Sequence, residues 1–178
     1  MIDEAGLAAL SMRKLADRVG VSRTALYHYF EGKDALLCSI AEEGFELYDK
    51  ALTQVSQDDA LNQHERVVGY VERYVNFSVE HASYYELMFG KTIWKESKAS
   101  ASLLQTSRTS FKRFVGIVEH WQEEGLVAKD DSPMRKAQVI WAALHGLSRF
   151  MIDGVYIDRQ SRAEMVQSMA KWLLHEAK

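Results

Sequence analysis

Several side chains near the N-terminus combine hydrogen-bond donors and methyl groups within four consecutive residues. Arg23 carries a guanidinium that can donate two parallel hydrogen bonds to a guanine edge, and Thr24 or Ala25 offers a methyl group for thymine. Ser22 has a hydroxyl that can cap a helix and can also contact a phosphate. These residue types in one short run predict contacts with DNA.

Two short amphipathic helices joined by a tight turn are predicted to position these groups. The first begins after Ser11, a good N-cap, and its apolar side chains recur at helical spacing. They are Met12, Leu15, Ala16 and Val19. Gly20 can take the left-handed conformation that ends a helix. In the second helix Leu26 and Phe30 lie one turn apart and form the inner face. The pattern predicts a helix-turn-helix, whose second helix enters the major groove.

The turn and the second helix also carry a spaced pattern of residue types. It consists of Gly20, Val21, Ser22, Leu26, Tyr27, Phe30, Lys33 and Leu36. This pattern, GVS-x-x-x-LY-x-x-F-x-x-K-x-x-L, resembles the DNA-binding domain of the TetR-type (tetracycline-repressor-like) transcriptional regulators. The resemblance implies phosphate contacts for Tyr27, His28, Tyr29, Lys33 and Arg13, whereas Arg23, Thr24 and Ala25 are expected to read bases.

These side chains also have ordinary structural interpretations. Tyr27 and Tyr29 could be packing residues, and Arg13, Lys14 and Arg18 could form a solvated face. The combined spacing favours DNA contact over these alternatives.

Composition limits the function classes that fit. The chain of 178 residues has a net charge of −3, but residues 11–33 carry a local excess of three positive charges, as in a specific DNA reader with an acidic body.

Cys38 is the only cysteine, so no disulfide can form within the chain and we expect a cytoplasmic protein. We expect the Cys38 side chain to be a small buried hydrophobe. We see no membrane span or signal peptide. The histidines are scattered without a metal-ligand spacing, and there is no phosphate-binding glycine loop. We therefore expect no catalytic residue, metal or cofactor.

The whole chain is predicted to be all-α. Helices are expected at residues 34–55, 61–80, 84–89, 100–124, 133–152 and 161–177, with breaks at 56–59 and 81–83 and a loop at 91–99. Gly125 is expected to end one helix, and Pro133 to stand in the first turn of the next. We expect a helix-turn-helix DNA-binding domain over residues 1–46 and a helical ligand-binding and dimerisation domain over residues 47–178.

The resemblance implies that the second domain binds a small-molecule effector. The pocket candidates are Tyr70, Tyr74, Phe77, Tyr85, Met88, Phe89, Phe111, Phe114, Trp121, Trp141 and His145. An aromatic stripe is usually core, so most of these residues could simply be buried, and His145 could be a satisfied core histidine or a pocket donor.

A homodimer follows from the small number of base pairs that one recognition helix reads. In the family the last two helices form a four-helix bundle with the partner subunit. The interface candidates are Val139, Ala143, Leu147, Phe150, Met165, Met169 and Trp172. The helix over 133–152 is apolar nearly all round and is therefore expected to be covered on several sides, although burial within the monomer could account for about half of these positions.

One departure from the family lies at the start of the chain. TetR-type domains begin with a helix before the helix-turn-helix, and here we expect residues 1–5 to be only its last turn. Leu15, Val19, Leu26 and Phe30 would then be partly uncovered. A misassigned start or a shortened chain is the favoured explanation.

The predicted function is a ligand-responsive transcriptional repressor. It binds a palindromic double-stranded DNA operator as a dimer and is released by a small, mostly apolar effector. The alternative is a helical dimeric protein that binds a ligand or another protein and has lost DNA binding through truncation of helix 1.

Overall fold

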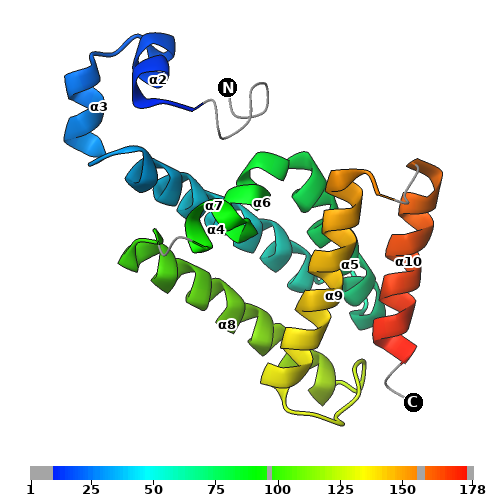
Figure 1. The fold of residues 1–178 in the computed structure, drawn as a ribbon. Helices are drawn as coiled ribbons and strands as arrows, with labels where there is room; N and C mark the ends of the chain where they lie inside the picture. The colour runs from blue at the N-terminus through cyan, green and yellow to red at the C-terminus, as the bar shows by residue number, and fades with distance from the viewer. Residues whose placement is uncertain (1–9, 96–97, 156–158, 176–178) are drawn as a thin grey trace. The chain divides into compact units, whose positions relative to one another are not determined.

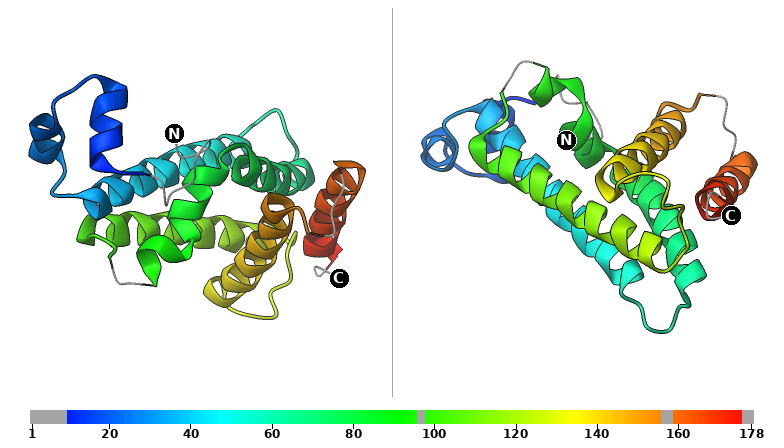
Figure 2. Two further views of the ribbon diagram at one scale, coloured as in Figure 1. Left: turned by 45° about the horizontal axis from the view of Figure 1, so that its top comes forward. Right: turned by 90° about the horizontal axis from the view of Figure 1, so that it is seen from below.

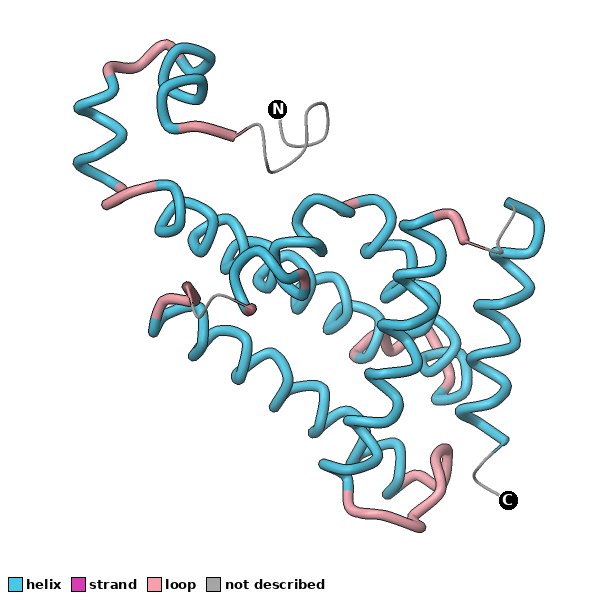
Figure 3. Tube along the Cα trace, viewed as in Figure 1, coloured by secondary structure: helices cyan, strands magenta, loops and turns pink. Residues whose placement is uncertain are grey.

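The computed structural model describes residues 10–95, 98–155 and 159–175, and every regular element in these ranges is an α-helix (Figures 1 and 3). The all-α class is confirmed for this part of the chain. The helices are α2 Met12–Val19, α3 Arg23–Tyr29, α4 Lys33–Ser56, α5 Gln63–Glu80, α6 Ala82–Phe89, α7 Lys91–Trp94, α8 Ala101–Glu123, α9 Pro133–Asp153 and α10 Arg159–His175. The expected remnant of helix 1 lies outside the described residues.

The predicted capping residues stand at the observed helix ends. Ser11 Oγ accepts a hydrogen bond from the Lys14 N–H at 3.2 Å, and Ser22 Oγ accepts one from the Ala25 N–H at 3.1 Å. Gly20 has φ 73°, in the left-handed region where a side chain would be strained. Short polar side chains and glycine fix these ends because they satisfy backbone groups that the helix itself leaves unpaired.

The structure corrects two of the predicted boundaries. The break at 81–83 is shorter, because α6 already begins at Ala82 after the C-cap His81. The predicted loop at 91–99 contains the short helix α7. The indole Nε1–H of Trp94 donates to the Met88 carbonyl oxygen at 2.8 Å, which anchors α7 to the end of α6.

The chain divides into two compact units. Unit 1 holds the residues up to Glu46 together with Ser83–Ser107, and unit 2 holds Leu47–Ala82 together with Arg108–Lys178. Helices α4 and α8 each contribute residues to both units. The domain boundary expected between residues 46 and 47 stays a prediction, since a contact division does not show that either part folds alone.

Unit 1 is held by the packing of the first half of α4 against α6. The ring centroids of Phe45 and Phe89 lie 5.4 Å apart, and Tyr85 lies 4.8 Å from Phe89. Gly44 lies so near that an added Cβ would be 2.9 Å from Met88 Sδ. The absence of a side chain at Gly44 therefore allows this close approach.

In unit 2, α5 packs against both α9 and α10. Figure 2 shows α9 and α10 side by side. The α5 side chains Tyr70, Val71 and Tyr74 are fully buried. Polar contacts tie α10 to α5: Gln167 Nε2 donates to Glu72 at 2.8 Å. Unit 2 is thus built around α5.

Candidate nucleic-acid interface and apolar surfaces

The predicted DNA-binding residues lie on one continuous helix-turn-helix in unit 1. Only Gly20, Val21 and Ser22 separate α2 from α3, and the two helices pack together. Arg13 lies on α2, Lys33 opens α4, and the remaining candidates lie on the turn or on α3. A three-residue turn with glycine is the geometry of a helix-turn-helix.

Helix α3 presents its polar and aromatic side chains to solvent. Arg23, Thr24 and His28 are exposed, and Tyr27 and Tyr29 are 56% and 82% exposed. Such exposure does not fit a packing role for either tyrosine within this chain. Within the described residues, Arg23, Tyr27 and Tyr29 have no polar partner. The surface therefore carries free donors and amphipathic rings, although its contact with DNA stays a prediction.

The inner face of the helix-turn-helix is only partly covered. Met12 and Ala16 are buried, but Leu15, Leu26 and Phe30 are half-buried, and no α3 residue is fully buried. Val19 is 61% exposed, in line with the expectation that it would be partly uncovered. The stripe ends one turn earlier because Val19 is the last residue before the turn.

The effector candidates fall into both units. Tyr85, Met88 and Phe89 belong to unit 1, and the others belong to unit 2. The former pack near Phe45, and Tyr85 and Met88 are fully buried. For Tyr85 and Met88 a core role accounts for the observed packing, whereas Phe89 is half-buried.

In unit 2 most candidates form a chain of ring contacts that passes from the core outward. Tyr70 stacks on Phe114 at 5.5 Å and meets Trp121 edge to face at 5.2 Å. Phe111 lies 6.3 Å from Trp141, which stacks on His145 at 5.4 Å. Burial raises the pKa of the Tyr70 hydroxyl, so this phenol stays neutral.

The rings at the two ends of this series of contacts differ in burial. Tyr70, Tyr74, Phe114 and Trp121 are buried, whereas Phe111, Trp141 and His145 are half-buried. Half-buried rings are the ones that a ligand could still reach. The structure thus separates the unit 2 candidates into a closed core and an accessible group.

The dimer-interface candidates cluster on one face of α9 and α10. An apolar groove of about 380 Å³ lies between these helices. It is lined by Ala143, Leu147, Met165, Ser168, Met169 and Trp172, all but one of which were predicted. Beside it on α9, Val139 and Phe150 are each 49% exposed. Within the single chain one apolar face of α9 remains open, so the expected cover on that side stays a prediction about the partner subunit.

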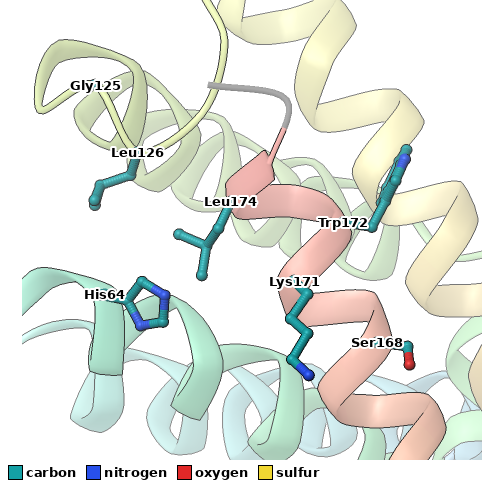
Figure 4. A pocket seen from close by; sticks show the side chains of 7 residues that line it. All are labelled: His64, Gly125, Leu126, Ser168, Lys171, Trp172 and Leu174. Atoms are coloured by element: carbon teal, nitrogen blue, oxygen red, sulfur yellow. The ribbon is translucent and has the colours of Figure 1, made fainter. Parts of the chain in front are cut away.

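A wider hollow of about 700 Å³ continues along α10 (Figure 4). His64 from α5, Leu126 from the segment after α8 and Leu174 from α10 point toward one another there. Ser168 and Trp172 line both this hollow and the apolar groove. Sequence reasoning missed Ser168, whose type gives no signal; only its position one turn before Trp172 places it on the same face.

Two classes of site are absent from the part of the chain that the structure describes. No three His, Cys, Asp or Glu side chains there form a group that could hold a metal ion. No helix among the described residues is long and apolar enough to cross a membrane. Cys38 is buried, as predicted, and its S–H donates to the Lys98 carbonyl oxygen at 3.4 Å.

Comparisons with known proteins agree with this architecture. Residues 1–40 match the family model of bacterial regulatory proteins of the tetR family, and residues 67–175 match that of the tetracyclin repressor-like C-terminal domain. The chain is 22% identical to the HTH-type transcriptional repressor NemR of Escherichia coli K12 over 145 residues, which cover 77% of this chain and 71% of NemR. It is 26% identical to the HTH-type transcriptional regulator BetI of Vibrio campbellii over 162 residues, which cover 88% and 73%.

The fold is shared with solved regulators. The TetR family transcriptional regulator PfmR from Thermus thermophilus superposes with a TM-score of 0.73 at 18% identity, and the superposition covers 99% of this chain and 94% of PfmR. With the C-terminal model spanning more than half of the sequence, this chain belongs to the TetR family of transcriptional regulators.

Proposed function

We propose that this chain is a ligand-responsive transcriptional repressor of the cytoplasm that binds a palindromic operator as a homodimer. The observation that carries the proposal is the solvent-exposed surface of α3, on which Arg23, Tyr27 and Tyr29 have no polar partner within the described residues. Free donors on a helix that follows a three-residue turn are suited to the major groove.

The roles of the α3 side chains follow from their positions. Arg23, Thr24 and Ala25 form the first turn of α3, from which side chains reach base edges. Arg23 makes a bidentate contact with guanine, and the methyl groups of Thr24 or Ala25 contact thymine. Ser22, Tyr27, His28, Tyr29, Lys33 and Arg13 hold phosphates and set the register.

Dimerisation is supported by the open face of α9 and α10. An apolar groove between two helices, flanked by half-exposed Val139 and Phe150, is unfavourable in water unless another surface covers it. A second copy offers the same face, and a two-fold axis then pairs the two recognition helices with two half-sites.

The effector is a small, mostly apolar molecule held at the accessible aromatic group of unit 2. Phe111, Trp141 and His145 supply ring faces and one polar handle. Binding there shifts the population of the dimer away from the form that fits the operator. Release of DNA by the effector is the regulatory step.

Fluorescence anisotropy with two labelled duplexes tests DNA recognition. One duplex comes from the region upstream of the protein's own gene, and the other is an unrelated sequence of equal length. We expect Arg23→Ala to weaken binding to the upstream duplex by about 1–3 kcal/mol while barely changing the unrelated one. Tyr27→Phe should weaken both about equally, because a phosphate contact carries no sequence information.

Lys129→Ala provides the matched control, since Lys129 is exposed and lies outside the helix-turn-helix. If the unsubstituted protein does not distinguish the duplexes, or Arg23→Ala keeps full affinity, the assignment of α3 as the reader is wrong. A dimer that binds ligand but no DNA would instead support the alternative of a protein that has lost DNA binding.

A further inference from the structure

A small cleft in unit 2 lies between the second half of α4 and the second half of α5. Its volume is about 190 Å³, and Phe77 lines it as the one fully apolar ring. Phe77 is only 4% exposed, so it forms a floor rather than a rim. Lys50 and Arg73 line the cleft from α4 and α5 respectively.

The two cations of this cleft are not neutralised. Neither Lys50 nor Arg73 has a hydrogen-bond or ion-pair partner within the described residues. Two other arginines of unit 2 are paired, since Arg66 of α5 binds Asp59 at 3.1 Å and Arg113 of α8 binds Asp49 of α4. Two free cations on facing helices beside an apolar floor favour an anionic group on an apolar body.

The cleft is also polarised along its length. Arg73 and Glu80 both line it and lie seven residues apart on α5, which corresponds to about 10 Å along the helix. Glu80 stands at the carbonyl end of α5, where the helix dipole is negative. An anion is therefore repelled from the Glu80 end and directed to the end with Arg73 and Lys50.

The volume of the cleft indicates the size of the group that it can cover. A cavity of about 150 Å³ is known to hold benzene, so 190 Å³ accommodates one six-membered ring and one small substituent. Phe77 and His81 contact each other in the cleft with ring centroids 4.7 Å apart, and together they offer an aromatic surface against which a ligand ring would lie.

We propose that this cleft binds a small aromatic monocarboxylate, with the carboxylate on Lys50 and Arg73 and the ring on Phe77 and His81. The site goes beyond the proposed function: it requires neither DNA binding nor dimerisation, and of the predicted effector residues it uses only Phe77. Its ligand class follows from two cations, one apolar floor and the small volume.

The probe is 4-fluorobenzoate, followed by ¹⁹F NMR titration of the full chain. We expect saturable one-to-one binding that weakens as salt rises, because exposed charges are screened. The uncharged 4-fluorobenzyl alcohol and the cationic 4-fluorobenzylamine should each bind about tenfold or more weakly. Equal binding of the alcohol and the carboxylate would overturn the role of the cations.

Three variants locate the site. Lys50→Gln combined with Arg73→Gln should weaken 4-fluorobenzoate about tenfold, whereas Lys112→Gln, which removes an exposed unpaired lysine of α8, should leave it unchanged. Glu80→Gln should strengthen binding about twofold, because it removes repulsion at a distance of about 10 Å. A gain of affinity cannot arise from misfolding. No binding by the unsubstituted protein, or equal binding by the double variant, refutes the proposal.

Discussion

At the scale of single residues, two buried serines differ in whether their hydroxyl groups are paired. Ser78 Oγ donates to the Val75 carbonyl oxygen at 2.7 Å, whereas Ser148 Oγ on α9 has no partner within the described residues. Both side chains are fully buried. An unpaired buried hydroxyl costs about 1–3 kcal/mol, and alanine is the better helix former. We expect Ser148→Ala to raise the free energy of unfolding by about 1 kcal/mol, measured by urea denaturation followed by circular dichroism.

Ser78→Ala is the matched control, because it removes a hydroxyl that already has its hydrogen bond. Its expected effect is no gain, or a loss of up to about 1 kcal/mol. Equal effects of the two substitutions would show that pairing of the Ser148 hydroxyl does not decide stability there.

At the scale of elements, two glycines within helices have opposite surroundings. A Cβ on Gly44 of α4 would lie 2.9 Å from Met88 Sδ and 3.1 Å from Tyr84 Cδ1, whereas nothing lies within 4 Å of a Cβ on Gly116 of α8. Replacing glycine by alanine in a helix gains up to about 1 kcal/mol, but overpacking costs about 1–3 kcal/mol. We expect Gly44→Ala to lower the free energy of unfolding by about 1 kcal/mol and Gly116→Ala to raise it by a similar amount.

The same urea titration measures both glycine variants. Opposite signs are the expected result, and the Gly116 variant controls for helix propensity. A stabilising Gly44→Ala would mean that α6 can move away from α4 without loss of packing.

The sequence predicts the helix ends well because they depend on local chemistry. Ser11, Gly20 and Ser22 act within one turn of their own position, so spacing alone locates them. The exposure of an apolar side chain is harder to predict, since it depends on which helices pack against its own helix. Val19 matched the apolar stripe of α2 yet is exposed, and the open face of α9 at Phe150 resembles its buried face in composition.

The candidate sites show the same division between local and tertiary information. The DNA-binding candidates are contiguous in sequence, so their motif could place them on one helix-turn-helix. Lys50 and Arg73 line one cleft only because the second halves of α4 and α5 face each other. No spacing within either helix reports that the two residues share a cleft, and sequence reasoning missed the cleft for that reason.

At the scale of the whole molecule, the open face of α9 and α10 predicts self-association. We expect a dimer at micromolar concentration in sedimentation velocity experiments. Phe150→Glu should yield monomers, because a two-fold interface contains each substitution twice and places two carboxylates near the same apolar contact. Tyr29→Ser, which removes an exposed aromatic ring from α3, should stay dimeric. A monomeric unsubstituted protein, or a dimeric Phe150→Glu variant, would contradict the assigned interface.

Helix α4 has a consequence for how members of the family can exchange parts. It runs without interruption from Lys33 to Ser56, although its residues divide between the two units after Glu46. An insertion of one residue turns every later position of a helix by about 100°, whereas seven residues restore the facing to within about 20°. Chimaeras joined within α4 should therefore keep its length or change it by seven residues, so that the buried side chains before and after the junction keep their relative orientation around the helix. A chimaera whose α4 is one residue longer or shorter would lose that orientation.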